Sequence, residues 1–112
     1  MIPGEIYMAD LGEVTPHPVI VVSREDLNRG DRAVAVLCTS QKLAVRSALP
    51  HCVPFKAGQF GFTKDCVAQC ENIFLVSKDS LEANPIGALD EIAMRDVIKA
   101  IAHVIDSDCE PN

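Results

Sequence analysis

Short apolar segments separated by proline and glycine fill the chain as far as about residue 87, and this pattern limits the fold more than any other feature. Residues 19–22 are β-branched and too few for a helix, so they predict a buried strand. Residues 5–11 and 33–39 predict two further strands, the first from its alternation of apolar and polar side chains. A chain of this kind favours an antiparallel β-fold with tight turns.

The middle of the chain continues in the same way. Residues 65–71 and 73–76 predict two separate short strands, and residues 49–55 predict a strand at a sheet edge because two prolines there lack N–H donors. Residues 24–32 form a polar connection with room for one helical turn, and residues 41–48 are expected to be irregular and basic.

One amphipathic helix is expected at the C-terminal end. Asp90 is a good N-cap residue. The apolar side chains at helical spacing are Ile92, Val97, Ile98, Ile101, Val104 and Ile105. We expect Ile98 and Ile101 to face the sheet. The 112 residues therefore predict one domain, 1–112, mainly β: a small antiparallel barrel closed by a C-terminal helix.

The cysteine content argues against disulfides. The chain has five cysteines: Cys38, Cys52, Cys66, Cys70 and Cys109. An odd number without a secretory signal predicts reduced thiols. Cys66 and Cys70 with His51 and Cys52 offer ligands for zinc, but the Cys-x3-Cys spacing in a strand separates its two thiols too far for one ion. We expect no metal and no cofactor.

Charge and hydropathy limit the possible partners. The net charge of −6 counts against nucleic-acid binding, which usually relies on basic residues, although an acidic protein can still carry a local basic groove. No apolar run approaches the roughly 18 residues that a membrane-spanning helix needs. We expect a cytoplasmic protein without membrane contact.

Several short motifs, in order along the chain, resemble one known family. Gly61-Phe62-Thr63-Lys64-Asp65-Cys66-Val67 is similar to its Gly-Leu/Phe-x-x-Asp-Ser-Val segment. The other matching segments are residues 3–11, 17–23, 28–29, 38–40, 71–73 and 86–90. Together they resemble the MazF/PemK toxins of type II toxin–antitoxin systems. The resemblance implies an SH3-like barrel, a homodimer, a small antitoxin-like partner protein and cleavage of single-stranded messenger RNA.

The resemblance fails at the cationic positions. The arginine that precedes Pro-Val in the family is His17 here, and the arginine that many members carry after Gln-Ile is Phe74. A third, from the Arg-x-Asp of some members, is Gln69. The loop before His17 is also shortened. An active site of this family would therefore be altered in this chain.

The resemblance and the side-chain chemistry together give the candidate site. His17 can carry protons in both directions near neutral pH, Thr39 can position a phosphate, and Glu71 can act as a base; these three are the candidate catalytic residues. The candidate RNA contacts are Ser40, Lys42, Arg46 and Gln69.

Two other functions stay open. The missing arginines and the acidic net charge favour a binding module that uses the same fold without catalysis. Such a module would bind an antitoxin, another protein or a nucleic acid in the groove. By analogy with the related CcdB branch, a gyrase-binding poison is a third possibility. Fold alone does not choose among them.

Overall fold

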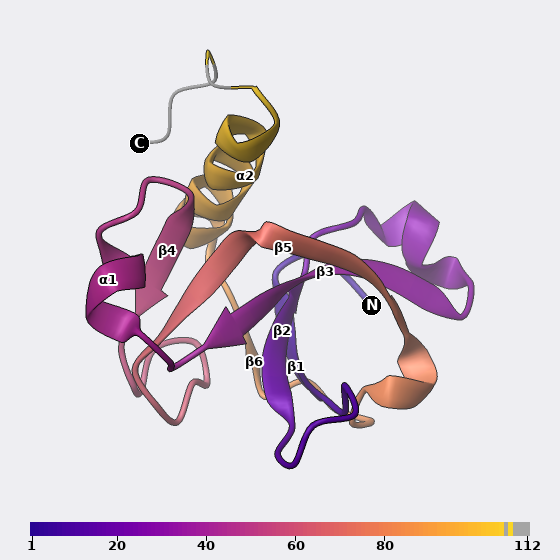
Figure 1. The fold of residues 1–112 in the computed structure, drawn as a ribbon. Helices are drawn as coiled ribbons and strands as arrows, with labels where there is room; N and C mark the ends of the chain where they lie inside the picture. The colour runs from indigo at the N-terminus through magenta and orange to yellow at the C-terminus, as the bar shows by residue number, and fades with distance from the viewer. Residues whose placement is uncertain (107, 109–112) are drawn as a thin grey trace.

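The computed structural model, described for residues 1–106 and 108, contains one curved antiparallel sheet and a C-terminal helix (Figure 1). The strands are β1 (Glu5–Ala9), β2 (His17–Val21), β3 (Arg32–Thr39), β4 (Cys52–Phe55), β5 (Cys66–Ser77) and β6 (Gly87–Ala88). Their order across the sheet is β4-β5-β3-β2-β1-β6. The mainly β prediction is confirmed, as a six-stranded half-barrel with a C-terminal helix.

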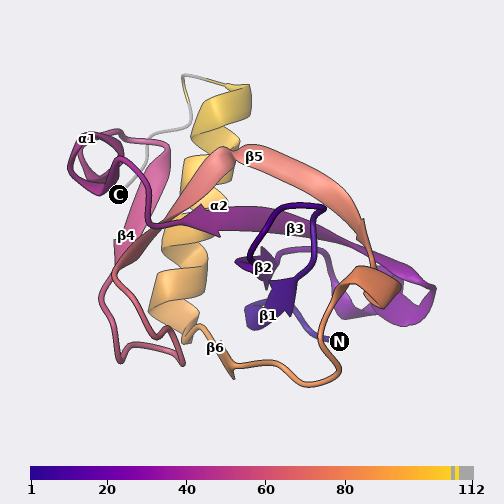
Figure 2. The ribbon, with the colours of Figure 1, turned by 60° about the horizontal axis from the view of Figure 1, so that its bottom comes forward.

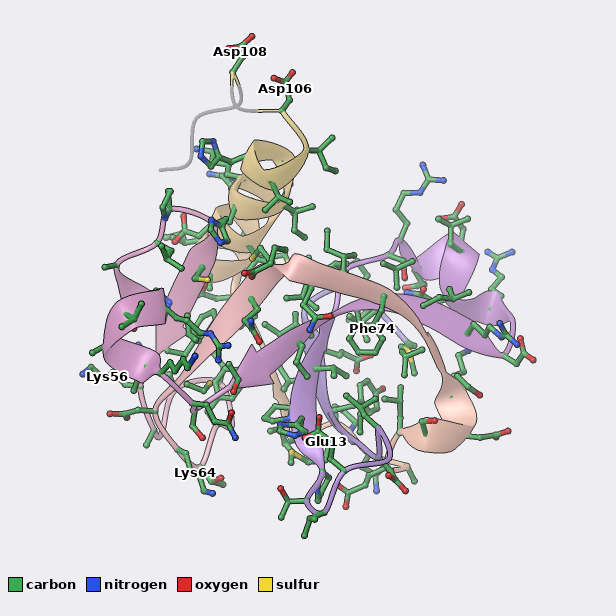
Figure 3. All side chains as sticks on the ribbon, viewed as in Figure 1. Glu13, Lys56, Lys64, Phe74, Asp106 and Asp108 are labelled. Atoms are coloured by element: carbon green, nitrogen blue, oxygen red, sulfur yellow. The ribbon has the colours of Figure 1, made fainter. Side chains whose placement is uncertain are left out.

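Both faces of the sheet are apolar, which explains the near-continuous apolar runs in the sequence. One buried cluster, with Ile6, Ile20 and Val36, lies on the face that α2 (Glu91–Ile105) covers. The other cluster contains Tyr7 and Val19, and Phe74 packs against it. Figure 3 shows Phe74 inside the curve of the sheet, where its side chain packs against this cluster.

The helix α2 lies against one side of the sheet (Figure 2). It begins as predicted, but the face that it turns to the sheet differs in part from the prediction. The Asp90 carboxylate accepts a hydrogen bond from the Ala93 N–H at 2.8 Å, which confirms the N-cap. Val97 is fully buried and Ile101 is partly buried against the core. Ile98 is 52% exposed, so its predicted orientation toward the sheet was wrong. The face nearest the sheet carries the alanines Ala93 and Ala100 instead, whose small side chains let the helix approach closely.

Two other elements differ from expectation. Residues 66–77 form one long strand rather than two, with an irregularity in its pairing opposite Val36 and Leu37. The segment expected to be irregular contains a short helix, α1 (Leu43–Ser47). The polar connection contains a 3-10 turn, Glu25–Arg29, as predicted; a second 3-10 turn, Lys78–Ser80, follows β5.

The strand register determines which side chains meet at the end of the sheet. Val19 of β2 pairs with Leu37 of β3, and this antiparallel register, continued by two residues, puts His17 opposite Thr39. The edge strand β4 pairs with β5, as its prolines suggested. Among the residues that the structure describes, no helix is long and apolar enough to cross a membrane.

A tight backbone contact positions the loop between β4 and β5. Gly61 has φ +93, and a Cβ there would lie 2.1 Å from the Ile86 carbonyl oxygen. A Cβ on Gly87 would lie 1.8 Å from the Phe60 carbonyl oxygen. Only glycine fits at these positions, because the two backbones touch where side chains would otherwise stand. The loop is thereby held beside the segment that leads to α2.

Candidate active site

A cavity of about 350 Å³ opens where β2 begins and β3 ends. Its walls come from the loop before β2, the end of β3 and the loop between β4 and β5. The lining residues are Met8, Thr15, Pro16, His17, Pro18, Cys38, Thr39, Ser40, Gln41, Phe62, Thr63, Lys64, Cys66 and Ile86. Polar groups thus converge on one hollow with an apolar floor, a typical form for a ligand site.

Three of the predicted site residues meet in this cavity. His17, Thr39 and Ser40 all line it, because the antiparallel neighbours β2 and β3 begin and end at this edge of the sheet. Thr39 is 7% exposed, and its Oγ1 accepts a hydrogen bond from the Gln41 N–H at 3.2 Å. That bond leaves the hydroxyl proton of Thr39 available to donate to a ligand.

His17 is held by a carboxylate that sequence reasoning did not assign to the site. The Nε2 atom of His17 lies 2.7 Å from Glu13 Oε2. A carboxylate can only accept, so Nε2 carries the proton and Nδ1 of the neutral ring is left able to take one. Because Glu13 stands only four residues before His17, a search of the sequence for carboxylates near His17 would have found this pair.

Lys64 is the second residue that the sequence analysis missed. It lines the cavity from the loop between β4 and β5, and it is the one Lys or Arg among the described lining residues. In Figure 3, Lys64 projects at the lower edge of the molecule, on the side that carries Glu13, whereas Lys56 projects near α1. Nothing local in the sequence marks Lys64, because tertiary packing of the loop brings it to the cavity.

The other predicted residues lie outside this cavity. Lys42 and Arg46 belong to the α1 segment, where the Arg46 Nη1 donates to the Gln41 carbonyl at 2.9 Å. Gln69 pairs with Leu37, two residues before Thr39 on β3. Glu71 is four residues along β5 from Val67, the partner of Thr39, and so roughly 13 Å away along the strand. The predicted catalytic trio is therefore not assembled: His17 and Thr39 meet without Glu71.

Two cysteines form the floor of the cavity. Cys38 is fully buried and Cys66 is 4% exposed. Their mutual hydrogen bond, together with burial, raises the pKa of Cys38, and the same bond lowers the pKa of Cys66. Both remain free thiols, as do Cys52 and Cys70; Cys109 lies outside the described residues. The described residues with metal-ligand spacing, His51, Cys52 and Glu71, lie away from this cavity.

The fold is similar to that of solved toxin structures. A mycobacterial endoribonuclease in complex with its cognate antitoxin is 24% identical and aligns over 94% of both chains with a TM-score of 0.77. The Mycobacterium tuberculosis toxin MazF-mt6 is 21% identical over 91% of this chain and 96% of that one, with a TM-score of 0.76. The structure of MazE–MazF from Deinococcus radiodurans is 14% identical and aligns over 95% of both chains with a TM-score of 0.75. At such identities the likeness establishes the fold.

Sequence comparison supplies the family. No curated protein matches the chain in sequence. The family model of the PemK-like, MazF-like toxins matches residues 2–105, nearly the whole chain. The order of motifs, the half-barrel with its C-terminal helix and this match agree, and the chain is a member of the PemK-like, MazF-like toxin family of type II toxin–antitoxin systems.

Proposed function

We propose that this protein is an endoribonuclease that cleaves single-stranded RNA with an altered active site built on His17, Glu13 and Thr39. The observation that carries the proposal is the cavity that His17, bound to Glu13 at 2.7 Å, and Thr39 line together. The similar mycobacterial structure is an endoribonuclease, which supports the choice of reaction. In this site a histidine–carboxylate pair takes the place of the family arginine.

The reaction needs one base and stabilisation of one developing charge. The RNA 2′-oxygen attacks its own phosphorus, the bond from phosphorus to the 5′-oxygen breaks, and a 2′,3′-cyclic phosphate forms. Nδ1 of His17 takes the 2′-hydroxyl proton, and Glu13 stabilises the resulting imidazolium. The leaving 5′-oxygen takes a proton from solvent in the open cavity.

The phosphate needs donors and positive charge. The Thr39 and Ser40 hydroxyls donate to its oxygens from the end of β3. Lys64 supplies the permanent charge that the family's arginines supply in related toxins. A lysine is a point charge and lacks the two-pronged contact that arginine makes with phosphate, so we expect slower cleavage than in relatives with arginine.

Cleavage of a fluorescent single-stranded RNA tests the proposal. Losing a general base typically costs 10²–10⁴-fold in rate, so His17→Ala should reduce kcat about that much. Glu13→Gln, which keeps the shape but removes the charge, should cause a smaller loss. Thr39→Ala should cost about 10²–10³-fold. Lys56→Ala, in the loop that carries Lys64 but outside the lining of the cavity, is the control and should cleave like the parent. Equal activity of His17→Ala and the parent would overturn the assignment.

The second candidate is a non-catalytic binding module. One observation favours it: among the described cavity residues, Lys64 is alone as a permanent cation, which is little charge for a nuclease. If the parent shows no cleavage while an antitoxin-like small protein binds and His17→Ala weakens that binding, this function replaces the first. In either case we propose a homodimer and a cognate antitoxin; two of the similar structures contain an antitoxin.

A further inference from the structure

Three side chains with metal-binding atoms converge at the start of β4, away from the cavity. His51 Nε2 lies 3.3 Å from Glu71 Oε2, and the Cys52 thiol lies 3.9 Å from Glu71 Oε1. The three ligand atoms are all within 4.8 Å of one another. Cys52 begins β4, His51 directly precedes it, and Glu71 lies in β5. Backbone pairing joins these segments: Cys52 pairs with Gln69, and the Cys70 N–H donates to the His51 carbonyl at 3.1 Å.

The spacing is close to that of a tetrahedral zinc site. Zinc lies about 2.0–2.3 Å from nitrogen, oxygen and sulfur ligands, which separates neighbouring ligand atoms by about 3.3–3.6 Å. The distance from His51 Nε2 to Glu71 Oε2 already has this value, whereas the Cys52 thiol lies 3.9 Å from the other carboxylate oxygen, Oε1. A rotation of the Glu71 carboxylate, or the use of both of its oxygens, brings the two contacts to one ion. The third pair, His51 nitrogen and Cys52 sulfur, lies within 4.8 Å and closes with about 1.3 Å of side-chain movement or less. No backbone shift is required, because hydrogen bonds join both the start of β4 and the preceding residue, His51, to β5.

The chemistry of the three ligands favours zinc among common ions. One nitrogen, one sulfur and one oxygen donor suit Zn²⁺, whereas Mg²⁺ and Ca²⁺ take oxygen ligands. Thiolate and carboxylate together carry two negative charges, which balance the ion. Cys52 is buried, while the side chains of His51 and Glu71 are 27% and 41% exposed. An ion therefore reaches the site from solvent, and its fourth position stays open to water.

We propose that His51, Cys52 and Glu71 bind Zn²⁺ and thereby fasten the start of β4 to the irregular part of β5. This departs from the expectation of a metal-free chain, for which the set Cys66 and Cys70 with His51 and Cys52 was weighed as zinc ligands. The thiols of Cys66 and Cys70 lie on one face of β5 four residues apart, whereas the proposed ligands come from the start of β4 and from β5. The segment 40–51 runs from the cavity wall to this site, so an ion at one end restrains the segment that begins at Ser40.

Cobalt substitution tests the site in the full-length chain after treatment with a chelator. Co²⁺ should bind one per chain and give a near-ultraviolet thiolate charge-transfer band, which Zn²⁺ then removes by competition. Cys52→Ser should abolish the band, and His51→Gln and Glu71→Gln should each weaken binding at least tenfold. Cys66→Ser, a buried cysteine outside the site, is the matched control and should keep the band. Absence of the band in the parent, or its survival in Cys52→Ser, overturns the proposal.

Thermal unfolding gives a second readout that does not depend on full stability of the variants. Each variant is compared with itself with and without Zn²⁺, since a bound ion raises Tm by mass action. The parent and Cys66→Ser should show a Zn²⁺-dependent rise in Tm, whereas Cys52→Ser should show none. Equal rises in all three would mean that the ion binds elsewhere. RNA cleavage is not used in either test, so failure here leaves the proposed function untouched.

Discussion

The side-chain contacts of His17 depend on its neighbours in the structure more than on its motif position in the sequence. Its Nε2 is committed to Glu13 at 2.7 Å, and its side chain is only 19% exposed. Sequence reasoning chose His17 and Thr39 because they stand at motif positions, and both do line the cavity. It chose Glu71 in the same way, from the motif at residues 71–73, but the register of β5 carries that residue away from the cavity.

Lys64 and Lys56 provide a matched pair for testing the proposed phosphate contact. They lie in the same loop, but only Lys64 lines the cavity. Lys64→Ala should weaken binding of single-stranded RNA and lower its salt dependence by about 0.7 in the log–log slope, the value for one lost phosphate contact. Lys56→Ala should change neither quantity. Fluorescence anisotropy over a salt series measures both, and equal effects of the two substitutions would contradict the role of Lys64.

The buried thiols make stability sensitive to alkaline pH. Burial, with contributions from Cys52 and Glu71, raises the pKa of Cys70 from 9.0 to about 12. Its folded-state pKa is raised, so its stabilising contribution is complete below pH 9 and is lost as pH rises toward 12. The free energy of unfolding from urea titrations should therefore fall above pH 9. Cys70→Ala should flatten this fall, whereas Cys66→Ala, which removes a thiol of lowered pKa, should not.

At the scale of elements, the sequence predicted whether a segment is helix or strand better than it predicted which side of the helix is buried. Long periodic segments such as α2 were clear, because the N-cap and apolar spacing agree. The helix α1 was missed because five residues are too few to show a helical period. The strand β5 appeared broken because the bulge places Glu71 and Asn72 in succession on the surface, interrupting the alternation. The prediction put Ile98 on the buried face of α2 because two of the side chains that are buried there, Ala93 and Ala100, are too small to stand out as an apolar face in the sequence.

The two isoleucines of α2 test this reassignment of faces. Ile101 packs against the core, and Ile98, three residues earlier, is 52% exposed. Fully buried Ile→Ala substitutions cost about 2–5 kcal/mol, so Ile101→Ala, only partly buried, should cost about 2 kcal/mol. Ile98→Ala should change the free energy of unfolding by less than about 0.5 kcal/mol. Urea titration of both proteins measures the difference, and the reverse order would restore the original orientation.

At the scale of the whole molecule, the chain keeps apolar surface that a single copy does not cover. Leu75 is 58% exposed, Ile98 52% and Ile105 77%. We expect a homodimer, because self-complementary pairing buries such side chains on both copies at once. Light scattering at micromolar concentration should give about twice the 12.1 kDa of one chain. A mass that stays at the single-chain value across a concentration series would contradict the prediction.

The contact between Gly61 and Gly87 has a consequence for how such a toxin changes its chemistry. The two glycine segments contact each other through backbone atoms, so the loop that carries Lys64 is positioned without contacts from the reactive side chains. The shape of the cavity is thus set independently of its reactive side chains, so Glu13, His17 or Lys64 can be substituted while the cavity keeps its shape. The two glycines are the opposite case, since any larger residue forces the walls apart. A library aimed at new RNA preferences should therefore vary the reactive positions freely and hold this pair of glycines constant.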